Sequence, residues 1–343
     1  MSRTSQLEKR PQSDYRQIDR LSYSALKDFD TDRKKFWRKY ILKEDLPRED
    51  SDFMTMGTLV DYLKTEPDSI DEHFVINTAP EPKPQMKTFC EILFNNKKQY
   101  KDLEFIALLH KSYEDLKANN GGKLSTGLEK YIINFNEDGV DYYQELIKSE
   151  GKIIITPEQL ELAKAIVYKI DNCNAFKTIG VIIPKVQVLF DYNKHDLKAE
   201  LDEVEDLSEG DWIIYDYKSS SFLETFFDNA YIKMKYYIQA YLYKIAFIQW
   251  CHQNNKECKS IQFKFKVVDM TNYGDPLLYE VPESHDSAAK NGFWYKGSWR
   301  KGVDQILEEI DYHTTNDKWG ASMYALKNNS TIVLPNLRTE NYE

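Results

Sequence analysis

Apolar residues recur along this chain at two different spacings, which separate the predicted helices from the predicted strands. In residues 21–42 and 156–173 the apolar positions lie three or four apart, which is typical of amphipathic helices. Residues 21–42 are predicted to form two short helices and residues 156–173 one. Residues 86–149 are predicted to be mainly helical, and a long helix is predicted over 230–250.

In the middle of the chain, strict alternation of apolar and polar residues replaces the helical spacing. "KVQVLFDY" (185–192), "DLKAELDEVED" (196–206) and "WIIYDYK" (212–218) alternate as strands do, and "LSEGD" (207–211) supplies a turn. "IQFKFKVVD" (261–269) is predicted to be a further strand after the long helix. A hairpin followed by a strand–helix–strand passage predicts an α/β or α+β core, with a central mixed sheet flanked by helices.

Two charged residues interrupt the apolar strand that ends in "DYK". Asp216 and Lys218 lie two residues apart and therefore share one face of a strand. On the preceding strand, Glu200 and Asp202 are expected to share a face by the same rule. If residues 207–211 form the turn, Asp202 lies beside Asp216. Two carboxylates and one ammonium group are therefore expected to converge.

Two neighbouring buried carboxylates need compensating positive charge. Lys218 supplies one charge, and a divalent cation would supply more. Carboxylate ligands, together with a backbone carbonyl such as that of Tyr217, suit Mg²⁺ or Mn²⁺ rather than zinc. Such a metal activates water and neutralises phosphate charge, which predicts phosphodiester hydrolysis. The alternative is an ordinary Asp–Lys ion pair at the edge of a sheet.

The long helix places further polar groups on one face. Gln239 and Tyr243 are one turn apart, and Tyr236 precedes Gln239 by three residues. A glutamine amide next to the predicted site can orient Lys218 or a substrate phosphate. The alternative is a packing helix on which the glutamine has no role in the chemistry.

Composition limits the class of protein. The 343 residues, of which 41% are hydrophobic and 14% aromatic, can bury a large core as one large domain or two ordinary ones. No run of about 18 apolar residues exists, and the N-terminus has no apolar segment, so neither a membrane span nor a signal peptide is predicted. The four scattered cysteines favour a reducing compartment, and a cytoplasmic location is expected.

The net charge of −10 argues weakly against nonspecific binding of nucleic acid, but a local basic surface remains compatible with it. Such a surface is predicted on the second of the two short helices. Its members are Arg33, Lys34, Lys35, Arg38 and Lys39. The alternative is a basic face that is simply solvated.

Six segments, in this order, resemble the PD-(D/E)xK nuclease superfamily. The flanking segments are "LSYSALKDFDTDRKKFWRKYI" (21–41), "GTLVDYLKTEP" (57–67) and "ITPEQLELAKAIVYKI" (155–170). The central ones are Asp202, "DYK" and the Gln-x-x-x-Tyr of the long helix. The chain is most similar to the branch of exodeoxyribonuclease VIII (RecE), lambda exonuclease and the RecB nuclease domain. The resemblance implies a restriction-endonuclease-like core.

The resemblance also implies roles for individual residues. Asp202, Asp216 and the Tyr217 carbonyl would bind metal, with Asp61 at the position where the family has a histidine. Lys218 would activate or position water, and Gln239 would orient Lys218 or a phosphate. Contacts to DNA are implied for Ser24, Arg33, Lys34, Lys35, Arg38 and Tyr243. Gln187 stands where relatives often have a glutamate, which puts a second metal site in doubt.

The activity implied is that of a Mg²⁺- or Mn²⁺-dependent exonuclease that resects duplex DNA ends for phage-type recombination. Its implied partners are a single-strand annealing protein and further copies of itself. Alternatives are a structure-specific or helicase-associated endonuclease, and a catalytically silent DNA-binding or assembly protein. We expect a flexible N-terminus (1–20), a nuclease domain (21–320) with a helical insertion (86–149), and a C-terminal tail (321–343).

Overall fold

The computed structural model of the chain describes residues 11–44, 52–77, 80, 82–221, 223–270 and 274–332. The predicted flexible N-terminus and C-terminal tail lie partly outside these ranges. The chain divides into two compact units. The first comprises residues 1–49 and 170–343, and the second comprises residues 50–169.

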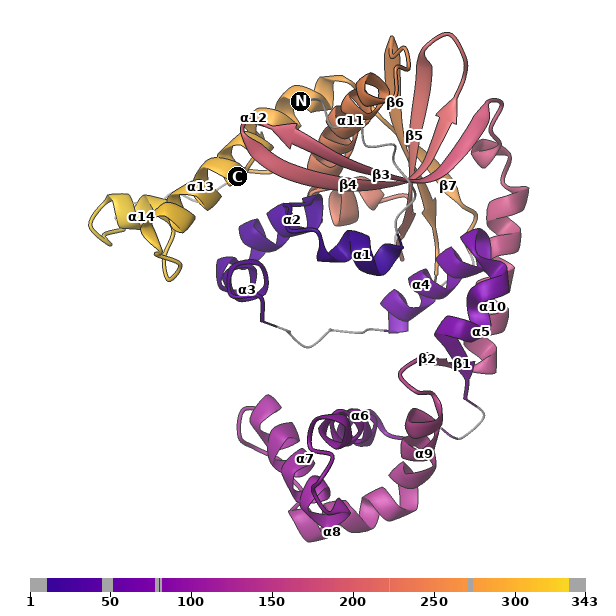
Figure 1. The fold of residues 1–343 in the computed structure, drawn as a ribbon, viewed down its shortest axis with the longest axis vertical. Helices are drawn as coiled ribbons and strands as arrows, with labels where there is room; N and C mark the ends of the chain where they lie inside the picture. Colours follow the sequence, from indigo (N-terminus) through magenta and orange to yellow (C-terminus); the bar gives the residue numbers. More distant parts are fainter. Residues whose placement is uncertain are drawn as a thin grey trace, which may run out of the picture. The chain divides into compact units, whose positions relative to one another are not determined.

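A five-stranded mixed sheet forms the centre of the first unit (Figure 1). Its order is β3 (Val181–Tyr192), β4 (His195–Asp206), β5 (Asp211–Ser219), β6 (Ser260–Val268) and β7 (Leu277–Val281). The β5–β6 pair is parallel and the other pairs are antiparallel. The predicted hairpin, the later strand and the mixed α/β sheet are therefore confirmed.

Helix α11 (Tyr236–Gln253) connects the parallel strands β5 and β6 and packs on the sheet. Its buried Phe247 belongs to one core with Ile214 of β5 and Phe263 of β6. The predicted helix over 230–250 begins late, because Lys235 at its N-cap is left-handed (φ 62°) and separates it from the π-helical turn η5 (Phe227–Ile232).

Short helices and one small hairpin complete the first unit, and the two helices predicted within residues 21–42 are present. The remaining elements are α1 (Gln12–Gln17), α2 (Tyr23–Thr31), α3 (Arg33–Phe36), η1 (Trp37–Ile41), η4 (Asn174–Phe176), α12 (Ser284–Asn291), β8 (Phe293–Tyr295), β9 (Ser298–Arg300), α13 (Val303–Asn316) and α14 (Met323–Lys327). Elements α1 and α14 fall within the segments predicted as flexible N-terminus and tail.

The second unit is mainly helical, as predicted for residues 86–149, and those helices have a core of their own that includes Phe89, Leu93 and Phe135. Its elements are α4 (Asp52–Thr65), η2 (Pro67–Ser69), α5 (Ile70–His73), β1 (Phe74–Ile76), α6 (Pro84–Gln99), α7 (Phe105–Asn119), α8 (Leu128–Asn134), η3 (Phe135–Gly139), α9 (Val140–Lys148), β2 (Ile153–Ile155) and α10 (Pro157–Asn172), the last of which ends in the first unit. Strands β1 and β2 pair in parallel.

Within the described ranges, no helix combines the length and the apolar character needed to cross a bilayer.

Candidate active site

The β4–β5 hairpin sets two acids opposite each other. Its ladder runs from Asp206↔Trp212 to Glu203↔Tyr215, so the next opposed positions are Asp202 and Asp216. No further backbone pair forms there. The backbone N–H of Tyr217 instead donates to Asp202 Oδ2 at 3.0 Å. The Asp202 carboxylate therefore occupies the point at which the two strands separate.

Asp216 lies at the centre of the cluster and is only 2% exposed. Its Oδ1 accepts a hydrogen bond of 2.7 Å from Gln239 Nε2 on α11, and its Oδ2 forms an ion pair with Lys218 Nζ. The Lys218 side chain is 15% exposed, and its ammonium group lies 4.7 Å from the centre of the Tyr236 ring. Lys218 is thus directed into the site rather than toward bulk water.

Burial raises the pKa of both carboxylates, and for Asp202 the charge of the neighbouring acid adds to the shift. The pKa of Asp202 is raised to about 7, first by burial and then by the charge of Asp216. Burial also raises the pKa of Asp216, although Lys218 and Gln239 oppose the shift. For Lys218 burial favours the neutral amine, but the two acids outweigh it and its pKa is raised. A charged lysine therefore faces two acids that would gain from a further cation.

The polar face of α11 lies against these acids. Burial raises the pKa of Tyr243 well above its usual range, and the charges of Asp216 and Asp202 add to that shift. Tyr243 and Gln239 are both close to these acids, so they lie on the same side of the helix, as their spacing predicted. The Oε1 atom of Gln239 is buried and has no hydrogen-bond partner in the part of the chain that the structure describes.

Sequence reasoning missed Lys185 on β3. The β3–β4 ladder pairs Pro184 with Glu203 and Val186 with Leu201 but omits the position between them, which is Lys185 opposite Asp202. Lys185 has φ 52°, a left-handed conformation that is uncommon inside a strand. Its positive charge lowers the pKa of both site acids. Pro184 is the one local sign of the interruption, because proline cannot donate to a ladder.

This interruption also corrects the predicted placement of Glu200. Leu201 and Val204, three residues apart, both belong to the core, so the alternation along β4 shifts by one residue at Asp202. The period of two is broken at Asp202. The reasoning that placed Glu200 on the same face of β4 as Asp202 therefore does not hold. Glu200 instead accepts a hydrogen bond of 2.9 Å from Gln187 Nε2.

A second missed lysine lies on α2. Burial lowers the pKa of Lys27, and the charge of Lys218 is among the groups that lower it further, against the opposing effect of Asp28. Lys27 thus lies within electrostatic reach of Lys218. Lys27 precedes the basic face that was predicted to contact DNA, which begins at Arg33.

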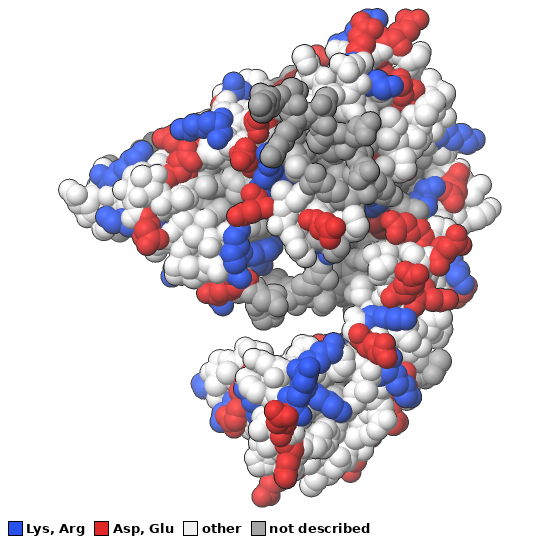
Figure 2. All heavy atoms as spheres, in the orientation of Figure 1, with Lys and Arg blue, Asp and Glu red and all other residues white. Residues whose placement is uncertain are grey.

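The residues predicted to contact DNA sit in varied surroundings. Ser24 is exposed on α2, and Lys34 is exposed on α3 with Lys35 half-buried beside it. The Arg33 guanidinium lies 5.9 Å from the Phe29 ring centre, whereas Arg38 Nε pairs with Glu44 at 2.6 Å. Figure 2 shows acidic and basic side chains interspersed on the visible surface. A DNA contact by these residues stays a prediction.

Asp61, the predicted third metal ligand, lies half-buried in α4 of the second unit. Helix α4 begins at Asp52, more than two turns before Asp61. Met56, Leu59 and Val60 are buried together on this helix, which explains why the helix extends through Gly57. The part of Asp61 in a metal site stays a prediction.

The donor set suits a hard cation. No group of three His, Cys, Asp or Glu side chains that could hold a metal occurs among the described residues. Two carboxylates are nevertheless a common protein contribution to a Mg²⁺ site, since this ion keeps several waters and takes substrate phosphate oxygens as ligands. Asp202 and Asp216 therefore fit Mg²⁺ or Mn²⁺ bound together with substrate, and not a closed zinc site.

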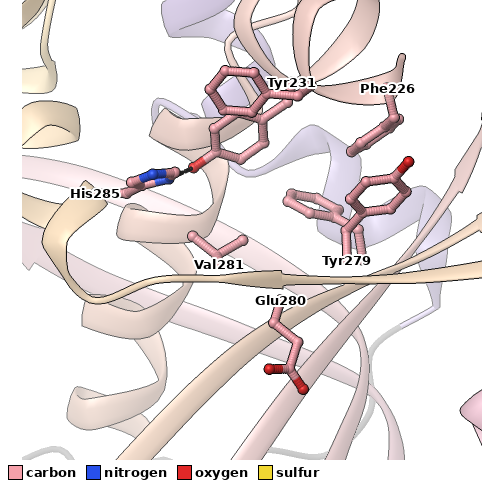
Figure 3. A pocket seen from close by; sticks show the side chains of 8 residues that line it. Phe226, Tyr231, Tyr279, Glu280, Val281 and His285 are labelled. Atoms are coloured by element: carbon pink, nitrogen blue, oxygen red, sulfur yellow. Dashed lines mark hydrogen bonds between the residues drawn. The ribbon is translucent and has the colours of Figure 1, made fainter. Parts of the chain in front are cut away.

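A small pocket of about 40 Å³ lies on the edge of the sheet near this cluster (Figure 3). It is lined by Phe226, Phe227, Tyr231, Phe265, Tyr279, Glu280, Val281 and His285. Phe226 and Phe265 pack on Tyr236, with ring centres 5.9 and 5.6 Å apart. The pocket walls therefore support the ring over which Lys218 lies.

No protein-family model and no curated protein matches the chain. Among solved structures, it is similar to that of a "putative exonuclease" from Eubacterium rectale. The two are 12% identical, with 96% of this chain and 97% of that chain covered and a TM-score of 0.48. At this level of similarity no functional conclusion transfers.

Proposed function

We propose that the protein is a metal-dependent deoxyribonuclease that hydrolyses phosphodiester bonds. The observation that supports it best is the convergence of Asp202, Asp216 and Lys218 from one hairpin, with Gln239 hydrogen-bonded to Asp216. The second acid, Asp202, is half-buried and accepts one backbone hydrogen bond, from Tyr217. Its pKa is raised to about 7, so the fold does not fully balance its negative charge.

In this proposal Asp202 and Asp216 hold Mg²⁺ or Mn²⁺, with Asp61 and the Tyr217 carbonyl as further ligands. When bound, such an ion lowers the pKa of a coordinated water and neutralises charge on the phosphate. Lys218 remains charged between the acids and donates a hydrogen bond to the attacking water or to a phosphate oxygen. Gln239 holds Asp216 in place, and Tyr236 confines the Lys218 ammonium.

The finer proposal is an exonuclease that resects duplex ends in phage-type recombination. It is supported by the resemblance of the ordered segments to the branch that contains exodeoxyribonuclease VIII and lambda exonuclease. On this proposal the enzyme acts in the cytoplasm beside a single-strand annealing protein, and a homo-oligomer would keep it on DNA.

The test is the incubation of end-labelled linear duplex and closed circular duplex with Mg²⁺, Mn²⁺, Ca²⁺ or EDTA. We expect degradation of the linear DNA with Mg²⁺ or Mn²⁺ only, intact circles, and loss of activity by about 10³-fold or more in Lys218→Ala. Cleavage of circles would favour the endonuclease alternative. DNA binding without any metal-dependent cleavage would overturn the proposed activity and favour a silent binding protein.

A further inference from the structure

The small hairpin β8–β9 has an unusual composition. Residues 290–301, "KNGFWYKGSWRK", contain four basic residues, no acidic residue and four aromatic residues, in a chain whose net charge is −10. Such interleaving of cations and aromatic rings is the composition of surfaces that bind single-stranded nucleic acid.

Two tryptophans occupy the outer side of this hairpin. Trp294 and Trp299 pair directly across the strands, with ring centres 5.7 Å apart and planes inclined by 67°. They are 71% and 43% exposed. Large aromatic rings usually bury their apolar area, and adjacent exposed aromatic rings are typical of surfaces that bind a partner.

The hairpin is preorganised. Lys296 and Gly297 form a two-residue turn with φ 47° and 71°, the left-handed pair that matches the twist of a tight hairpin. Trp299 Nε1 also donates to Gln305 Oε1 at 2.9 Å, which fixes the ring. A partner that stacks on these rings would therefore lose little binding energy to ordering them.

The inner side anchors the hairpin to the helix that serves the candidate site. Phe293 packs edge-on against Tyr237 of α11 with ring centres 5.0 Å apart, and the Tyr237 hydroxyl donates to the Lys301 carbonyl at 3.0 Å. Tyr237 directly follows Tyr236, over which the Lys218 ammonium lies. The platform and the candidate catalytic lysine are thus attached to the same end of α11.

The ammonium group of Lys296, at the tip of the hairpin, remains accessible to phosphates. Lys296 at the tip pairs with Asp228 at 2.8 Å, but both side chains are exposed, and exposed pairs of this kind contribute little to stability. A phosphate can therefore compete for Lys296. Lys301, by contrast, pairs with Asp30 and Glu309 and holds the hairpin base.

We propose that Trp294 and Trp299 form a stacking platform for unpaired bases at the end of a nucleic-acid strand, with Lys296 contacting the adjacent phosphate. The proposal deepens the nuclease function argued above and rests on it for the choice of DNA as ligand. The platform is expected to bind frayed or single-stranded ends, since a base inside a closed duplex is stacked on both sides and cannot stack on a tryptophan ring.

The test compares the unmodified chain with the double variant Trp294→Ala/Trp299→Ala. Affinities are measured by fluorescence anisotropy, in Ca²⁺ and in EDTA, for a blunt duplex, a duplex with one mismatched end, and a single strand. We expect the double variant to lose about 10-fold or more in affinity for the mismatched end and the single strand. The blunt duplex should change by less than about 3-fold.

Two controls isolate stacking from a general loss of structure. Trp294→Phe keeps an aromatic face and should retain most of the affinity. Tyr324→Ala removes an exposed aromatic side chain of the same unit, on α14, and should change nothing. Circular dichroism checks that the double variant is folded.

Equal loss on all three DNAs, or no loss on any, would overturn the platform. A double variant that binds DNA normally but changes its oligomeric state in light scattering would overturn it too, since the tryptophans would then be covered by a second copy. Because binding is measured without hydrolysis, these outcomes are independent of nuclease activity. Absence of Mg²⁺-dependent cleavage would reject the nuclease and leave the binding result standing.

Discussion

The two faces of strands β4 and β5 each carry two acids close to a lysine, but the pKa of Asp202 is raised on one face and that of Glu205 is lowered on the other. One face holds Asp202, Asp216 and Lys218. The other holds Glu203, Glu205 and a lysine from β6, Lys266, whose side chain is only 3% exposed. Tyr215 and Tyr217 point to this second face, where their hydroxyl groups donate to Glu205 and Glu203.

On the second face every carboxylate oxygen has a fixed partner. Glu205 Oε1 accepts from the backbone N–H groups of Ile179 and Gly180 at 2.5 and 2.6 Å, and its Oε2 accepts from the Tyr215 hydroxyl at 2.8 Å. Burial tends to raise the pKa of Glu205, but these donors outweigh it and the pKa is lowered. Gly180 is required here, since a Cβ would lie 2.1 Å from the Asp206 carbonyl oxygen.

Glu203 is equally well matched. Its Oε2 pairs with Lys266 Nζ at 2.6 Å, and its Oε1 accepts from the Tyr217 hydroxyl at 3.1 Å. The Lys266 ammonium also lies 4.1 Å from the centre of the Tyr215 ring. This face therefore needs no ligand to be stable.

Asp202, one residue away on β4, has a single backbone donor and a raised pKa. Burial tends to raise the pKa of Asp202 and of Glu205 alike, but only Glu205 has enough fixed donors to lower it. The first face therefore has negative charge that the fold does not balance, which suits a substrate or metal site better than a purely structural cluster.

The largest expected difference is between removing the two lysines. Lys218→Ala should lower cleavage by about 10³-fold or more and change the free energy of unfolding by less than about 1 kcal/mol, because Asp216 can become protonated. Lys266→Ala should lower the free energy of unfolding by about 3 kcal/mol and cleavage by the folded protein by less than about 10-fold, because it removes a buried cation and leaves the half-buried Glu203 without its ion pair.

Urea unfolding and single-turnover cleavage of linear duplex measure both quantities. Lys218→Ala could instead lose much stability, with activity reduced only in proportion to the unfolded fraction. Lys218 would then be a structural residue like Lys266, and the proposed difference between the two faces would be wrong.

The next effect concerns pH. The folded-state pKa of Asp202 is raised to about 7, above the ordinary value near 4. The stabilisation linked to its protonation is therefore fully present below pH about 4 and is lost as pH rises through about 7. In EDTA, the Tm of the unmodified chain should fall as the pH rises from 5 to 8. The Tm of Asp202→Asn should fall by about 2–4 °C less over the same range.

Asp196→Asn, at an exposed position of the same strand, is the control and should leave the pH profile unchanged. Adding Mg²⁺ at pH 8 should raise the Tm of the unmodified chain and not that of Asp202→Asn. Parallel pH profiles for all three proteins would contradict the raised pKa.

The smallest effect concerns Lys185. Lys185→Gly relieves the left-handed backbone and should raise the free energy of unfolding by about 0.5–1 kcal/mol, while the lost charge should lower cleavage by about 10-fold. Lys194→Gly is a matched control, because Lys194 is also left-handed (φ 64°) and highly exposed in the β3–β4 turn.

Lys194→Gly should give the same gain in stability with unchanged cleavage. If both glycine variants keep full activity, the charge of Lys185 has no part in the reaction.

The sequence was sufficient for the parts of the site that local patterning determines. Alternation and the Gly-containing turn fixed the pairing that sets Asp202 opposite Asp216, and the one-turn spacing placed Gln239 and Tyr243 together. The left-handed Lys185 was not predictable, since lysine has no preference for that conformation. Lys266 follows an alternating pattern that predicts exposure, and its burial depends on distant contacts, among them the Phe176 ring.

The short strands β7, β8 and β9 were also beyond prediction, because three to five residues are too few to establish a period. The tryptophan pair of the hairpin was missed for the same reason. Its exposure is a tertiary property that no local pattern reports.

The order of segments in the first unit has a consequence for biosynthesis. Strands β3, β4 and β5 are contiguous, so the two aspartates can meet by hairpin closure while α11 is still within the ribosome. Helix α2, which carries Lys27, is made earlier but joins this core only after the 120 residues of the second unit (50–169) have been translated. A nascent chain can therefore bring its two acids together before Gln239 is made, and the charged cluster can be completed only after about seven tenths of the polypeptide has been synthesised.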